Sequence, residues 1–155
     1  MTVLAAVRPD AWNLPLFIHV AGAMALVASL IVASYTLKIA RDRGDQPAAE
    51  FAFRTLLRFT LPAYLVMRVG AQLIASKEKV EHSNATWLGI GFITSDLGLL
   101  LLIIGLVLSG LMARRAKGGT SVAGATQLRV ASAITGVLLL AYLVAIWAMT
   151  TKPGA

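Results

Sequence analysis

Four long runs of apolar residues make up most of the chain, and short polar segments separate them. The runs cover residues 14–37, 55–75, 86–113 and 130–150. Each is close to or longer than the roughly 20 residues that an α-helix needs to cross the hydrocarbon core of a bilayer. The pattern predicts an all-α membrane protein, a bundle of four transmembrane helices that forms a single domain over residues 1–155. Because every connection is short, neighbouring helices are expected to run antiparallel.

The segments between the runs are polar and are interpreted as loops. Residues 38–54 are rich in charge and contain the helix breakers Gly44 and Pro47. Residues 76–85 form a small polar turn, and residues 114–129 are basic and glycine-rich. None of these segments is long enough to fold into a soluble catalytic domain, and the chain lacks phosphate-loop, zinc-protease and nucleophile-elbow motifs. We therefore expect no enzymatic activity.

The composition supports a membrane location over a soluble one. Hydrophobic residues make up 58% of the chain, compared with about 45–50% in soluble domains, and the mean hydropathy is +0.79. A net charge of +7 would suggest nucleic-acid binding in a soluble protein. Here the basic residues gather at the ends of the apolar runs, as in proteins that contact anionic lipid headgroups. The expected partners are the lipid bilayer and anionic headgroups at the cytoplasmic face, with no nucleic acid.

The distribution of basic residues orients the chain. Nine flank the first and third connections: Lys38, Arg41, Arg43, Arg54, Arg58, Arg114, Arg115, Lys117 and Arg129. Four lie on the opposite side: Arg8, Lys77, Lys79 and Lys152. Because basic loops stay in the cytoplasm, both termini are expected on the outer side. Trp12, Trp87 and Trp147 fall near the outer helix ends, in agreement with the preference of tryptophan for the membrane interface.

Small residues follow one another at intervals of four along the first run, at Ala21, Ala25, Ser29 and Ala33. Such spacing lets a second helix approach closely, which is how membrane helices associate. The stripe serves either packing within the bundle or association with another copy of the chain or another membrane protein. The sequence leaves both alternatives open.

Ionisable side chains inside the runs predict a buried polar layer. Each costs roughly 2.5–3.5 kcal/mol to insert into the centre of a membrane helix. Counted inward from the outer helix ends, one polar residue on each helix reaches the same level: His19, Arg68, Asp96 and Tyr142. At ~1.5 Å per residue this level lies roughly 10–14 Å below the outer surface. Gln72 lies one turn above Arg68 and is expected to belong to the layer.

The chemistry of the layer suggests which residues pair. Asp96 is the only acid within a run, and the planar guanidinium of Arg68 suits a carboxylate. His19 could hydrogen-bond Asp96 or transfer a proton, because imidazole exchanges protons near neutral pH. On a helical wheel Arg54, Arg58, Arg68 and Gln72 share an arc of about 80°. That arc is expected to face the bundle interior or a wet cavity rather than lipid.

Two interpretations of the layer remain open. In one, Arg68 and Asp96 form a structural ion pair that fixes helix packing. In the other, a site opens to the outer side, where Arg68 binds an anion or His19 and Asp96 relay protons. The expected function is accordingly a structural protein or accessory subunit of the membrane. The first alternative is a small proton- or anion-linked transporter that works as an oligomer, and the second is a haem- or copper-binding membrane protein.

Metal and cofactor sites find little support in the sequence. There is no cysteine, and His19 is the only histidine within an apolar run, which disfavours a haem held by two histidines. Histidine–methionine ligation through Met24 or Met67 remains possible. In the turn 76–85, His82 lies beside Glu78 and Glu81, but such a polar turn is expected to be solvated. We therefore expect no metal and no cofactor.

Two stretches carry a resemblance to known membrane proteins. LFIHVAGAMALVAS at 16–29 places a histidine and then small residues near the start of a helix. WLGIGFITSDLGLLLLIIGLVLSGLMARR at 87–115 has an aromatic–glycine entry, an Asp-x-Gly step and an apolar exit into arginines. The chain resembles small, uncharacterised bacterial integral membrane proteins that are distantly similar to the membrane domain of copper-resistance D proteins. The resemblance implies four helices in the bacterial cytoplasmic (inner) membrane and no particular activity.

Overall fold

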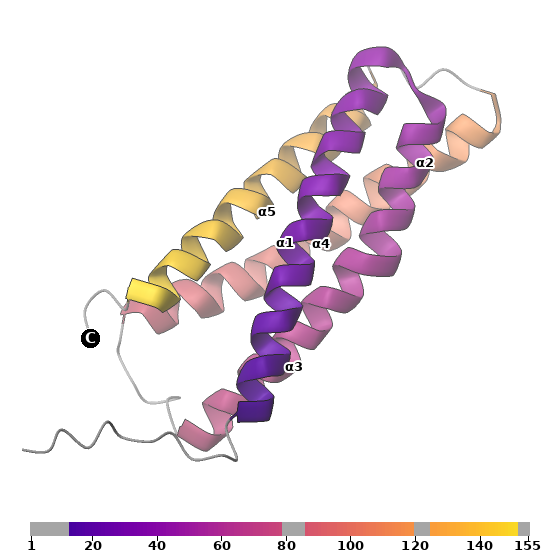
Figure 1. Ribbon diagram of the computed structural model, residues 1–155. Helices are drawn as coiled ribbons and strands as arrows, with labels where there is room; N and C mark the ends of the chain where they lie inside the picture. Colours follow the sequence, from indigo (N-terminus) through magenta and orange to yellow (C-terminus); the bar gives the residue numbers. More distant parts are fainter. Residues whose placement is uncertain (1–12, 79–85, 120–124, 152–155) are drawn as a thin grey trace, which may run out of the picture.

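The computed structural model describes residues 13–78, 86–119 and 125–151, and the elements within these ranges are all helices (Figure 1). In chain order they are α1 (Asn13–Arg43), α2 (Gln46–Thr55), η2 (Leu56–Thr60), α3 (Leu61–Glu78), α4 (Thr86–Lys117) and α5 (Thr126–Thr151). Because α2, η2 and α3 follow one another without a break, they form one long helix. The described ranges thus contain four helices long and apolar enough to cross a membrane. The chain is a multi-pass membrane protein, and its described residues are almost entirely helical.

The first connection is far shorter than the sequence predicted. α1 continues to Arg43 and α2 begins at Gln46, so the prediction of a loop over 38–54 is wrong for most of its length. The segment is rich in alanine and arginine, which are good helix formers. Its polarity therefore indicates where the chain leaves the hydrocarbon core, and the helices themselves continue past that point.

The turn between α1 and α2 consists of two residues. Gly44 adopts a left-handed backbone conformation with φ of 67°, which glycine reaches without steric penalty. The side chain of Asp45 accepts a hydrogen bond of 3.0 Å from the backbone N–H of Ala48 and caps α2. Pro47 lies in the first turn of α2, where its missing N–H has no helical partner to lose. The predicted helix breakers therefore end one helix and start the next.

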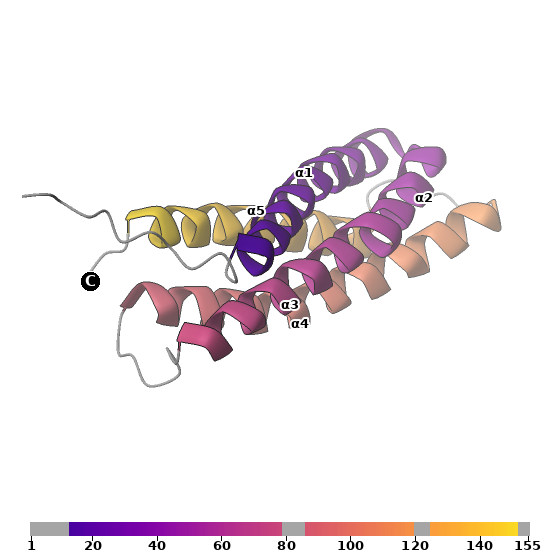
Figure 2. The same ribbon diagram turned by 60° about the horizontal axis from the view of Figure 1, so that its bottom comes forward.

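The long helices associate as two pairs. α1 packs along α3, and α4 packs along α5. Near the α1–α2 turn the pairs meet, with α2 against α4 and α1 against α5, whereas α3 and α4 scarcely touch. Figures 1 and 2 show the two pairs diverging away from that turn. Any polar contact between α3 and α4 therefore joins the pairs where they have little other contact.

The core between the pairs consists mainly of leucine and alanine. Its most buried leucines come from α1, η2, α4 and α5: Leu26, Leu30, Leu37, Leu56, Leu102, Leu128 and Leu138. Alanines at the helix crossings let these side chains interdigitate. The core thus extends from the end at the α1–α2 turn past the middle of the bundle.

One end of the bundle is strongly basic. α1 ends there, α2 begins there, and Lys117 at the end of α4 lies 3.1 Å from the carboxylate of Glu50 in α2. Arg54 contacts the same carboxylate. Trp87 and Trp147 lie toward the opposite end, near the start of α4 and the end of α5, while Trp12 is outside the described residues. The two kinds of residue thus separate along the bundle axis.

The α1–α3 crossing brings two backbones into direct contact. A Cβ added to Gly22 would lie 2.5 Å from the backbone nitrogen of Met67. A Cβ added to Gly70 would lie 2.6 Å from the backbone nitrogen of His19. Since no real Cβ approaches a backbone atom so closely, each glycine supplies space that the other helix occupies.

The predicted stripe of small residues on α1 is divided between two environments. Ser29 and Ala33 are buried in the bundle, whereas Ala25 is exposed. At Gly22, next to Ala21 of this stripe, α1 contacts the backbone of α3 directly. The spacing of small residues therefore predicted which helix makes a close contact, and the contact lies on a face of α1 next to the predicted one.

A wide helical turn precedes Pro62. In η2 the N–H of Leu61 donates to the carbonyl of Leu56, five residues back, and the hydroxyl of Thr60 donates to the carbonyl of Thr55 at 3.4 Å. Proline offers no N–H and clashes with the carbonyl four residues before it. A π-helical turn relieves that clash and rotates α3 relative to α2.

Candidate functional site

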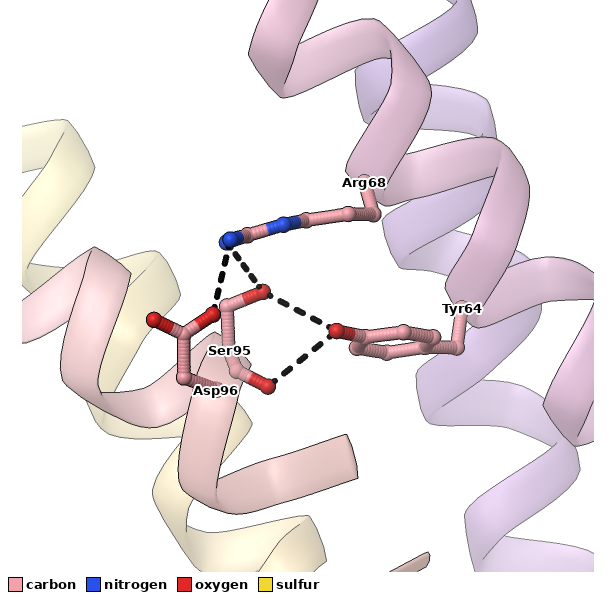
Figure 3. Close-up of polar contacts among 4 residues, drawn as sticks. All are labelled: Tyr64, Arg68, Ser95 and Asp96. Carbon is pink, nitrogen blue, oxygen red and sulfur yellow. Dashed lines mark hydrogen bonds and ion pairs between the residues drawn. The ribbon is translucent and has the colours of Figure 1, made fainter. Parts of the chain in front are cut away.

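A polar cluster connects α3 to α4, and Figure 3 shows its four residues. Arg68 donates from Nη2 to Oδ1 of Asp96 at 2.7 Å and from Nη1 to Oγ of Ser95 at 2.9 Å. The hydroxyl of Tyr64 donates to the backbone carbonyl of Ser95 at 3.2 Å. Tyr64 and Arg68 are four residues apart on α3, so they share one face and reach the same turn of α4.

The cluster extends from the interior of the bundle to its surface. Tyr64 and Ser95 are buried, with 2% and 7% of their surface exposed. The side chains of Arg68 and Asp96 are 30% and 66% exposed. The guanidinium carbon of Arg68 also lies 5.9 Å from the centre of the Phe92 ring, a favourable cation–π distance. The charged end of the cluster thus faces outward at the seam between α3 and α4.

The prediction of a fully buried layer is wrong for two of its members. Asp96 and Gln72 are both exposed. The helical-wheel arc that carries Arg58, Arg68 and Gln72 lies toward the outside of the bundle. The opposite face of α3, with Gly70, packs on α1. Backbone contact at the glycines determines the rotation of α3, and Arg68 reaches α4 from the edge of the packed face.

His19 lies at the α1–α3 seam, apart from Asp96. Its Nδ1 is 2.9 Å from the backbone carbonyl oxygen of Met67. Because a carbonyl oxygen only accepts, Nδ1 carries the proton in this contact. The hydrogen bond holds α1 against α3 beside the Gly70 contact. The structure therefore does not assemble the predicted relay between His19 and Asp96.

Tyr142 is buried in the α4–α5 pair. Its hydroxyl lies against Gly98, where an added Cβ would be 2.5 Å from the oxygen. The hydroxyl has no hydrogen-bond partner among the described residues. Tyr142 thus shares the level of the cluster and stays outside its network.

We expect Tyr142→Phe to raise the free energy of unfolding by about 1 kcal/mol, because a buried hydroxyl without a partner is unfavourable. The measurement is thermal unfolding of the purified protein in detergent. Gly98→Ala is expected to lower the stability of the wild type and to be better tolerated together with Tyr142→Phe, which removes the clashing oxygen. A lower stability of Tyr142→Phe alone would show that the hydroxyl is hydrogen-bonded.

Sequence reasoning identified Arg68 and Asp96 and missed Tyr64 and Ser95. Both were detectable: Tyr64 precedes Arg68 by one helical turn, and Ser95 directly precedes Asp96. A hydroxyl beside an intramembrane charge is a natural hydrogen-bond partner.

The described residues contain no group of three or more histidine, aspartate or glutamate side chains that could hold a metal ion. The predicted turn with His82 and Glu81 lies outside them, as does the side chain of Glu78. Of the two methionines considered beside His19, Met24 is exposed on the outside of α1 and Met67 is buried. Within the described ranges, His19 is hydrogen-bonded to the backbone carbonyl of Met67.

An open groove of about 360 Å³ lies between α1 and the α2–η2 segment. It is lined by Ala25, Ala28, Ser29, Val32, Phe51, Thr55 and Phe59. Its lining contains no ionisable side chain and is apolar apart from the hydroxyls of Ser29 and Thr55.

Comparison of the chain with protein-family models, curated proteins and solved structures found no match. The similarity to copper-resistance D proteins rests on the two sequence stretches alone and stays a prediction. The arrangement of the described residues is therefore the basis for the functional argument.

Proposed function

We propose that the protein is a non-enzymatic structural or accessory subunit of a membrane. The observation that carries this proposal is the use of the intramembrane charges. Arg68 is bonded to both Ser95 and Asp96, so the guanidinium joins the two helix pairs. A neutral pair that joins helices stabilises one arrangement of the bundle, the chief requirement for a subunit that presents a fixed surface.

We further propose a location in the bacterial cytoplasmic membrane with both termini on the outer side. The basic end of the bundle, where Lys117 meets α2, supports this orientation, because basic ends remain in the cytoplasm and attract anionic headgroups. The chain contains no cysteine, so a single Gly118→Cys substitution tests the orientation. Labelling of intact cells by a membrane-impermeant thiol reagent would contradict it.

A small transporter is the second candidate, and the exposed carboxylate of Asp96 is the observation that favours it. Reconstituted liposomes with a pH-sensitive dye inside separate the two functions. A structural subunit is expected to leave the proton and chloride permeability of the vesicles at the level of protein-free controls. Proton or anion flux that Asp96→Asn abolishes, in a variant that still folds, would overturn the structural proposal and support transport.

A further inference from the structure

The ion pair between Arg68 and Asp96 is incomplete within one chain. A carboxylate can accept about four hydrogen bonds and a guanidinium can donate five. Within the described residues one donor reaches Asp96, and Arg68 uses two of its donors. Two thirds of the Asp96 side chain and almost one third of the Arg68 side chain are exposed. Acceptors and donors thus remain available side by side on the α3–α4 seam.

Lipid acyl chains cannot supply the hydrogen bonds that this exposed ion pair can still form. Asp96 lies ten residues into α4, about 15 Å along the helix axis, and its short side chain cannot reach the headgroups. The exposed neighbours Ile93, Leu97 and Leu100 are apolar, as expected against acyl chains. Charged groups at such positions normally face protein or a wet cavity. These apolar side chains need no polar partner, whereas the Asp96 carboxylate can accept further hydrogen bonds beyond the one from Arg68.

We propose that a second copy of this chain covers the α3–α4 seam, so that Asp96 of each copy accepts a hydrogen bond from Arg68 of the other. This inference rests on the proposed function and names the partner that the α3–α4 seam of such a subunit binds. The four groups would form a closed ring of alternating charge with no net charge.

Symmetry and depth favour a second copy. All copies insert in the same direction, so a two-fold axis along the membrane normal can relate two of them, and rotation about that axis preserves depth. Each exposed carboxylate then meets a guanidinium at its own level. A surface that carries both a donor and an acceptor surplus is complementary to itself. A foreign helix with one basic residue would satisfy Asp96 and leave Arg68 facing lipid.

Photo-crosslinking in native membranes tests the inference. Leu97→p-benzoylphenylalanine places a photoreactive group beside Asp96 without removing either charge. Leu143→p-benzoylphenylalanine on α5 is the matched control, since Leu97 and Leu143 are 57% and 47% exposed and Leu143 adjoins Tyr142 at the level of Gly98. We expect an adduct of twice the chain mass at position 97, several-fold stronger than at 143, and a several-fold loss of it with Asp96→Asn.

The other outcomes separate this inference from the proposed function. An adduct at position 97 with a different protein would overturn the second copy as partner and leave the accessory-subunit proposal standing. Irradiation that yields lipid adducts alone at position 97 would overturn the inference, because the charged seam would then face the bilayer, and would leave the proposed structural role of the ion pair within one chain standing. Equal dimer adducts at both positions would overturn the inference by indicating random collision.

Discussion

Gly22→Ala and Gly70→Ala are each expected to lower the free energy of unfolding by about 2–3 kcal/mol, the upper part of the range for overpacking a tight contact. The new methyl group would lie within 2.6 Å of the backbone of the partner helix in either case. A backbone inside a helix cannot move aside alone, so α1 and α3 must separate and the bond between His19 and Met67 must lengthen. Thermal unfolding in detergent measures the loss as a fall in Tm of roughly 5–10 °C.

Gly136→Ala provides the control for these substitutions. Gly136 lies inside α5, and an added Cβ would meet nothing within 4 Å. Alanine is the better helix former by roughly 1 kcal/mol, so the control is expected to be neutral or slightly stabilising. Equal Tm values for Gly70→Ala and Gly136→Ala would rule out backbone contact between α1 and α3.

Arg68→Met is expected to lower the free energy of unfolding by about 1–2 kcal/mol, since it removes charge-assisted hydrogen bonds to Ser95 and Asp96. The partial exposure of the pair keeps the effect below that of a fully buried ion pair. Arg58→Met is the matched control, because Arg58 is exposed on the same long helix and forms no ion pair with the described residues. Similar losses for both variants would show that the cluster adds nothing to stability.

The sequence predicted the features that depend on length and depth. Hydrophobic length is a local property, so the four spans followed from it directly. Counting residues inward from the helix ends also brought Arg68 level with Asp96, since helical rise is constant. The structure places these two side chains in contact.

The features that depend on helix rotation were not predictable in the same way. The helical wheel groups Arg68 and Gln72 on one arc, and that arc was predicted to face the bundle interior because charge exposed to lipid is unfavourable. The structure turns Gly70 inward instead, and the benefit of a missing Cβ is visible only once the backbone of the other helix is in place. The π-turn before Pro62 shifts the rotation further from that of a regular wheel.

The prediction of a long first connection was wrong for a related reason. Residues 38–54 contain charges, a glycine and a proline, a composition common to loops and to helices that leave the membrane. The capping role of Asp45 depends on its position relative to Ala48, which polarity averaged over the segment does not capture.

A double-mutant cycle with Arg68→Met and Asp96→Asn, followed by thermal unfolding in detergent, most directly tests whether this ion pair joins the two helix pairs. The account predicts a coupling free energy above about 1 kcal/mol, since the stability effects of substitutions at residues in direct contact are not additive. The double variant should therefore lose less stability than the sum of the single variants. Additive losses would contradict the contact and, with it, the functional surface built on the α3–α4 seam.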